Sequence, residues 1–170
     1  MSVKAEDLVV SRIGAVYRGM IFPCSVGKNG IGQKTGEGDN ITPVGIWSIK
    51  QVYFRADRLA QPMSIVPTMP IGPSDIWSDD PRDVHYNHKL RKRNHPFGHE
   101  HLSRSDPLYD VVAVLDFNWP VAIPGAGSAI FLHHWRKPRH PTAGCVAFSP
   151  EILRYILETW TPRSRVVIRA

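Results

Sequence analysis

Short apolar runs rich in β-branched residues alternate with glycine and proline along the chain, a pattern that predicts strands rather than long helices. Residues 109–116 (YDVVAVLD) form the clearest predicted strand. Further strands are predicted over residues 15–24, with a weak point at Gly19, and over 45–54, 128–133 and 165–169. Between the first two, residues 25–30 end in Asn-Gly, which indicates a turn and favours a hairpin.

One segment has helical spacing instead. Ser149-Pro150-Glu151 supplies an N-cap, a proline suited to the first helical position and an acid that complements the helix dipole. Apolar side chains then recur at helical spacing over residues 152–157, and Thr161-Pro162 ends the helix. The whole predicts one mainly β domain over residues 1–170 with a small helical component, and not alternating βαβ units.

A stretch rich in proline and histidine, residues 56–106, carries few periodic apolar residues. A structureless loop of this length is uncommon inside a compact domain and is usually functional when it occurs. We therefore expect this stretch to form a lid or wall over a binding groove.

The composition is that of a soluble globular protein, with 42% hydrophobic and 21% charged residues. The formal net charge of +6 attracts polyanions, either nucleic acid or anionic cell-wall fragments, although charge runs such as residues 88–93 are also common on solvated loops. The first residues lack the positive charge and apolar core of a signal peptide, and no apolar run is long enough to insert into a membrane. We expect a cytoplasmic protein; an upstream start codon with an export signal would instead make it periplasmic.

Two cysteines, Cys24 and Cys145, make no disulfide framework and fit a reducing compartment. Cys24 falls inside a predicted strand, where it is expected to be buried and inert. Cys145 follows a small turn, Thr142-Ala143-Gly144, and His133 ends an apolar strand shortly before it. An imidazole can take the proton of a thiol, and backbone N–H groups near Gly144 can stabilise an oxyanion, although a free cysteine is also often an inert core residue.

The stretch from Ile130 to Val146 resembles the signature of the L,D-transpeptidase catalytic domain family, also called YkuD-like. In that signature a histidine follows an apolar strand, and a Ser/Thr-x-Gly-Cys turn comes next; here these are His133 and residues 142–145. Residues 27–45, with Thr-Pro-Val-Gly, and the segments around Trp77 and Tyr86 also resemble one branch of the family, so the likeness runs from about residue 16 to 168.

The resemblance implies a β-sandwich-like fold with the cysteine in a groove under a loop. It also implies that Cys145 forms a thioester on the L-centre of diaminopimelate in peptidoglycan stem peptides, with His133 as base and release of D-alanine. Three features depart from the usual form: Ala143 replaces a histidine, Ala147 replaces an arginine, and the gap between His133 and Cys145 is short. For a cytoplasmic enzyme that meets recycled wall peptides we expect water as acceptor, meaning L,D-carboxypeptidase action; cross-linking onto an amine is the alternative.

Substrate contacts are predicted on several residues. The resemblance suggests the first four, and the others lie in expected groove walls: Trp77, Asp80, Tyr86, Asn87, His99, Glu100, His134 and Arg136. Because Ala147 removes the usual arginine, Arg136, Arg139 or Arg82 could bind the substrate carboxylate. His134 points away from His133 on a strand and is therefore assigned to a wall or a structural role rather than to catalysis.

The sequence contains weaker signs of other functions, namely a zinc site, a phosphate-binding loop and a non-catalytic binding module. The pairs His99/His101 and His85/His88 could supply imidazoles to zinc, but no HExxH motif is present, and no metal or cofactor is predicted. The glycines near residues 36–38 and 125–127 lack a full phosphate-loop pattern and are expected to be plain turns. A non-catalytic module that binds wall peptides would gain nothing from a reactive thiol, and no nucleic-acid-binding module is recognisable.

Overall fold

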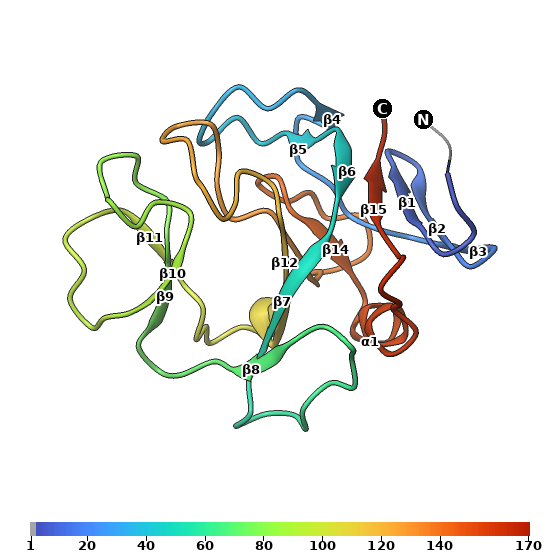
Figure 1. Ribbon diagram of the computed structural model, residues 1–170. Coiled ribbons are helices and arrows are strands. Elements are labelled where there is room, and N and C mark those ends of the chain that lie inside the picture. Colours follow the sequence, from blue (N-terminus) through green and yellow to red (C-terminus); the bar gives the residue numbers. More distant parts are fainter. Residues whose placement is uncertain (1–2) are drawn as a thin grey trace.

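The structure, a computed structural model, describes residues 3–170 and is built mainly from strands (Figure 1). Two five-stranded sheets form its bulk. The first has the order β3-β2-β1-β15-β6, with β1 Leu8–Ser11, β2 Gly14–Tyr17, β3 Met20–Phe22, β6 Gly45–Trp47 and β15 Val166–Ile168. The second has the order β14-β13-β12-β7-β8, with β7 Ile49–Phe54, β8 Thr68–Pro70, β12 Val111–Leu115, β13 Phe131–His134 and β14 Val146–Phe148.

Smaller elements complete the fold. A three-stranded sheet has the order β10-β9-β11, with β9 Asp75–Ser78, β10 Lys89–Arg91 and β11 His99–His101. A parallel pair joins β4 Ile31–Gly32 to β5 Thr42–Pro43. A short 3-10 helix, η1 Pro107–Tyr109, leads into β12, and the α-helix α1 spans Pro150–Glu158.

One hydrophobic core joins the two large sheets and α1. Leu8 of the first sheet, Leu132 and Val146 of the second, and Leu153 of the helix are all fully buried in it. The two sheets therefore share a sandwich-like core, and with 33% strand and 7% helix the predicted mainly β fold is confirmed.

The helix follows its sequence signals. The Ser149 side chain accepts a hydrogen bond from the backbone N–H of Ile152 at 3.3 Å, as an N-cap does. The helix ends at Glu158, slightly before the predicted stop at Thr161-Pro162.

Two predicted strands are each broken in the structure. Residues 15–24 are not one strand: Arg18 and Gly19 have positive φ angles of 48° and 77°, and the chain turns back so that β2 and β3 pair antiparallel. Residues 45–54 pass from one large sheet to the other, because the backbone N–H of Ser48 leaves the strand to bind Asp116 Oδ1 at 2.7 Å.

The Asn-Gly turn is present, with the N–H of Gly30 donating to the carbonyl of Gly27 at 2.8 Å. The strand that follows does not fold back as a hairpin, however, since β4 pairs with β5 in parallel.

Residues 56–106, the stretch expected to form a lid or wall, have regular structure of their own. They contain β8 to β11, and every residue of β9 is buried. The Asp75 carboxylate at the start of β9 binds Lys89 at 2.7 Å and Arg91 at 3.1 Å across the sheet. Strands of three or four residues held by such polar pairs show no readable apolar period, so the hydrophobic pattern does not predict them.

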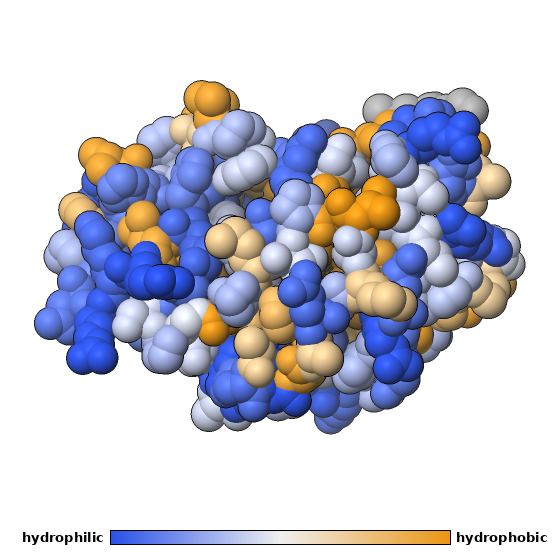
Figure 2. All heavy atoms as spheres, turned by 60° about the horizontal axis from the view of Figure 1, so that its bottom comes forward, coloured by the Kyte–Doolittle hydropathy of each residue, from blue (hydrophilic) through white to orange (hydrophobic). Residues whose placement is uncertain are grey.

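Exposed apolar side chains are scattered in small groups among polar ones on the face shown in Figure 2. Within residues 3–170, no helix has the length and apolar character needed to cross a bilayer.

Candidate active site

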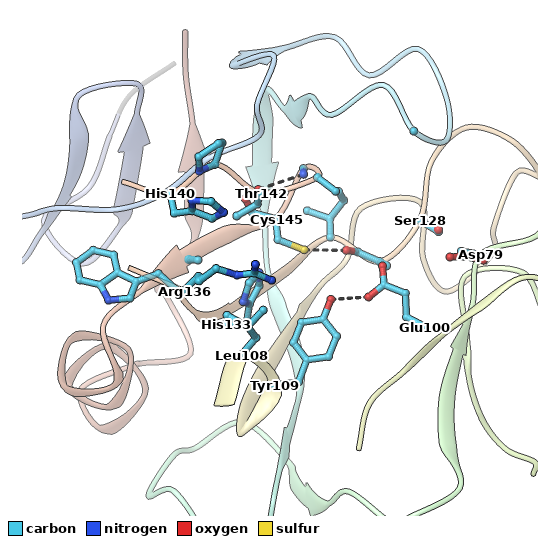
Figure 3. A pocket seen from close by; sticks show the side chains of 18 of the residues that line it. Asp79, Glu100, Leu108, Tyr109, Ser128, His133, Arg136, His140, Thr142 and Cys145 are labelled. Carbon is cyan, nitrogen blue, oxygen red and sulfur yellow. Dashed lines mark hydrogen bonds between the residues drawn. The ribbon is translucent and has the colours of Figure 1, made fainter. Parts of the chain in front are cut away.

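Two neighbouring parallel strands position the predicted nucleophile and base. β13 pairs with β14 in the register Leu132↔Val146 and His133↔Ala147. Cys145 immediately precedes β14, so the register places it beside Phe131 at the start of β13, two residues before His133 on the same face of the strand. Both side chains line one cavity of about 400 Å³ (Figure 3).

The turn before the cysteine is held from within and also lines the cavity. Thr142 Oγ1 donates to the carbonyl oxygen of Cys145 at 2.6 Å and accepts the N–H of Gly144 at 3.1 Å. Gly144 has φ 146°, and a Cβ there would lie 3.0 Å from the carbonyl oxygen of Ile41. Glycine is therefore required at this position by both its backbone conformation and the close packing.

The thiol of Cys145 is buried and makes its hydrogen bonds with backbone. Sγ donates to the carbonyl of Ala129 at 3.0 Å and accepts the N–H of Phe131 at 3.4 Å, and no hydrogen bond joins it to His133. Burial, and secondarily the charge of Glu100, raises the pKa of this thiol to about 12. The resting nucleophile is thus a protonated thiol at neutral pH.

The imidazole of His133 is neutral and fixed. Its Nδ1 lies 2.7 Å from the carbonyl oxygen of His134, and its ring meets that of Tyr109 edge-on with centroids 5.3 Å apart. Burial lowers the pKa of His133 to about 4, although the carbonyls of His134 and Leu108 oppose the shift. A neutral ring with a set orientation is suited to accept a proton.

Tyr109 is a wall residue that was not predicted. It looked like the first residue of a strand, whereas it ends η1 and turns into the cavity. Its hydroxyl donates to Glu100, as Figure 3 shows, and burial raises the pKa values of both groups. Tyr109 lies just before the apolar strand β12, and Ser128 and Ala129 lie just before β13. A polar or small residue at the start of an apolar strand was the one feature of the sequence that could have indicated these wall residues.

Two of the predicted substrate contacts, Glu100 and Arg136, do line the cavity. Six others lie outside its wall: Trp77, Asp80, Tyr86, Asn87, His99 and His134. Side chains that line it and were not predicted include Lys34, Glu37, Asp79, Arg104, Leu108, Ser128 and His140.

Asn87 supports the site from behind instead of facing substrate. Its Oδ1 accepts hydrogen bonds from Trp77 Nε1 and from the backbone N–H of Ala129, both at 3.0 Å. Its Nδ2 donates to the carbonyls of Phe117 and Asn118 at 3.2 and 2.6 Å. Asn87 thereby holds in place the residue whose carbonyl binds the Cys145 thiol.

The other displaced residues also have structural contacts. Tyr86 donates its hydroxyl proton to Glu37 and accepts the N–H of Gly127 at 3.0 Å. Asp80 pairs with Arg82 at 2.6 Å, and Nδ1 of His99 lies 2.7 Å from the carbonyl of Phe97.

The two adjacent histidines face opposite sides of β13. His134 lines a different cavity, against Pro150, Glu151 and Leu157 of α1. The structure places His133, and not His134, in the cavity that the cysteine turn lines, and the predicted substrate contact of His134 has no place there. The catalytic role of His133 stays a prediction.

Of the three arginines considered for a substrate carboxylate, only Arg136 reaches the cavity. Arg82 is paired with Asp80 outside it, and Arg139 does not line it. Within residues 3–170, no group of three or more histidine, cysteine, aspartate or glutamate side chains is arranged to hold a metal ion.

Comparison with known proteins gives one result. The family model of the L,D-transpeptidase catalytic domain (YkuD) matches residues 3–168, nearly the whole chain. No curated protein and no solved structure matches. The match covers both sheets and the cavity that His133 and Cys145 line, and it implies acyl transfer of the L,D-transpeptidase type on peptidoglycan peptides. This chain belongs to the L,D-transpeptidase catalytic domain family.

Proposed function

We propose that this enzyme is an L,D-carboxypeptidase, which cleaves the bond between diaminopimelate and D-alanine in peptidoglycan stem peptides. The observation that carries the proposal is the placement of the Cys145 thiol and the His133 imidazole in one cavity, beside a glycine turn that no other residue fits.

Acylation begins with a proton transfer. The thiol turns away from Ala129 toward His133, gives the ring its proton, and the sulfur attacks the carbonyl carbon of the scissile bond. The backbone N–H of Gly144 is engaged by Thr142, so we assign the adjacent amide of Cys145 as donor to the developing oxyanion. The C–N bond then breaks, and the leaving amine of D-alanine takes the proton from His133.

The leaving D-alanine carries a carboxylate, and Arg136 is the group we assign to it. Arg136 lines the cavity, is exposed, and makes no ion pair among the described residues. A guanidinium binds a carboxylate in a bidentate manner. This contact replaces the arginine that Ala147 removes from the usual family pattern.

Water is the acceptor we assign to the thioester. A cavity of about 400 Å³ suits a single donor peptide. The cavity lined by His134 lies on the other side of β13 and cannot present an amine to Cys145. Water activated by His133 attacks the thioester, the C–S bond breaks, and the thiolate regains its proton.

The test is incubation with a diaminopimelate-containing tetrapeptide, with and without an amine acceptor, followed by mass spectrometry. Hydrolysis predicts tripeptide and D-alanine in both reactions and a transient acyl adduct on Cys145. A cross-linked product as the main species would instead assign transpeptidation. If the peptide binds but the enzyme with its intact thiol does not convert it, the protein is instead a non-catalytic module that binds wall peptides.

A further inference from the structure

Charged side chains are divided between two sides of the active-site cavity. Figure 3 shows Arg136 and His140 on one side of Cys145 and Asp79, Glu100 and Ser128 on the other. Glu37 lines the same cavity and acts electrostatically on Asp79 and Glu100. We call Glu37, Asp79, Glu100 and Ser128 the acidic wall.

The three carboxylates of the acidic wall form no ion pair with any described residue, although the charge of Arg104 acts on Glu100 from a distance. Glu37 and Glu100 each accept a hydrogen bond from a tyrosine hydroxyl, and no side chain donates to Asp79. The basic side chains nearby are used elsewhere: Lys34 pairs with Asp39 and Arg104 with Asp106, both at 2.6 Å. Burial raises the pKa values of Asp79 and Glu100, and their negative neighbours raise them further.

Ser128 adds an independent sign of a missing ligand. It is 5% exposed and lines the cavity, and although its hydroxyl lies beside that of Tyr86, no group of the described chain donates a hydrogen bond to its Oγ. A buried hydroxyl oxygen without a donor is costly, so a native structure normally provides one. Ser128 belongs to the same side of the cavity as Asp79 and Glu100, so a donor bound there would supply what it lacks.

The chemistry of the wall selects the kind of ligand. The wall offers oxygen acceptors, and an ammonium carries three N–H donors and a positive charge. The acids are not clustered tightly enough to hold a metal ion, whereas an ammonium on a flexible stem needs no such convergence. A cation here would also lie within electrostatic reach of the thiol, since the charge of Glu100 acts on Cys145.

We propose that the acidic wall binds the free primary ammonium group on the side chain of the acyl-donor residue. The inference rests on the proposed function for the identity of that residue, a diamino acid. Cross-linking converts this amine into an amide, which has no charge and only one N–H. The enzyme therefore accepts stem peptides whose side-chain amine is free and rejects those already cross-linked through it.

The test uses two tetrapeptides that differ only in the side-chain amine of the third residue, free in one and acetylated in the other. Binding to Cys145→Ser is measured calorimetrically without any acceptor, so that only the donor site is read. We expect the free amine to bind at least tenfold more tightly. Asp79→Asn in the same background should reduce this preference below about threefold, and Glu151→Gln, an equal charge change at the other cavity, should not.

Equal affinity for the two peptides, or a preference that survives Asp79→Asn, overturns the inference. If Asp79→Asn does not fold, Glu37→Gln at the exposed rim serves in its place. This variant should lose part of the preference for the free amine. An unchanged preference would contradict a role of the acidic wall in binding.

Hydrolysis of the same two peptides by the enzyme with an intact Cys145 distinguishes a failure of this inference from a failure of the proposed function. Hydrolysis of both peptides at equal rates rejects the ammonium site and keeps the carboxypeptidase. Selective binding with no hydrolysis of either peptide keeps the ammonium site and rejects the carboxypeptidase.

Discussion

The Cys145 thiol donates its proton to the carbonyl oxygen of Ala129, 3.0 Å away. The same carbonyl belongs to the residue whose N–H is held by Asn87. In the resting enzyme the nucleophile is therefore a neutral thiol whose proton is bound by a rigid backbone carbonyl. Before it attacks, the thiol has to leave this carbonyl and transfer its proton to the neutral ring of His133.

The nucleophile is tested first by deletion of each thiol. Cys145→Ala should abolish turnover, and Cys24→Ala should leave most of it, because Cys24 lies outside the cavity. Burial raises the pKa of Cys24 to about 11, which keeps it unreactive. Mass spectrometry after incubation with a carbapenem should show one adduct, on Cys145; an adduct on Cys24 alone contradicts the assignment.

The base is tested by comparing adjacent histidines. His133→Gln should slow acylation by on the order of 10²-fold or more, the usual loss for a general base. His134→Gln should cost far less, since that side chain faces the other cavity. Single-turnover acylation rates give the comparison, and a reversed order of the two variants would show that the roles are exchanged.

The pH dependence of alkylation reports the resting state of the thiol. With the pKa of Cys145 raised to about 12, the thiolate fraction in the free enzyme grows roughly tenfold per pH unit from neutrality upward. Inactivation by iodoacetamide should therefore be slow at pH 7 and still rising at pH 10. A plateau between pH 6 and 8 would reveal a thiolate–imidazolium pair instead.

His133 should also make the fold sensitive to mild acid. Its pKa falls from 6.5 to about 4 on folding, so the unfolded chain binds its proton first. The free energy of unfolding is unaffected by this group well above pH 6.5 and falls as the pH drops toward 4, by about 3 kcal/mol. Denaturant unfolding at pH 7 and pH 4.5 measures this decrease in the free energy of unfolding, which should be smaller in His133→Gln. An equally large decrease in that variant would show that His133 is not its source.

Asn87 should matter for both stability and chemistry. It is 2% exposed and has φ 59°, and its side-chain amide joins Ala129 of the cavity wall to Trp77 and to the backbone of residues 117–118 behind it. Asn87→Ala should lower the free energy of unfolding by about 2–4 kcal/mol and slow acylation, since Ala129 loses its support. Thermal melts and acylation rates are compared with those of Asn94→Ala, an exposed control; similar values for the two variants would contradict the role.

Sequence reasoning found what is local and regular. The capped helix at residues 149–158, the strand at 111–115 and the place of His133 and Cys145 in one cavity all rest on short-range patterns. It missed the sheet formed by β9 to β11, whose strands are too short for a period and are fixed by the ion pairs of Asp75.

Long-range placement explains the errors in the site. Trp77 and Asn87 resembled substrate contacts, but folding turns them behind the cavity. Asp79 and Tyr109 come from distant segments, and no local pattern indicates that they meet at Cys145. The cellular compartment and the choice of acceptor stay predictions.

The parallel pairing of β13 with β14 fixes the catalytic spacing by hydrogen-bonded register and not by the length of the chain between them. Within this connection, residues 135–141 can therefore change in length without shifting the two strands, whereas the turn at Thr142–Gly144 has to be kept. Loops of other lengths grafted over residues 135–141 should change which peptides enter the cavity, since Arg136 and His140 line it, while His133 and Cys145 keep their places on the strands.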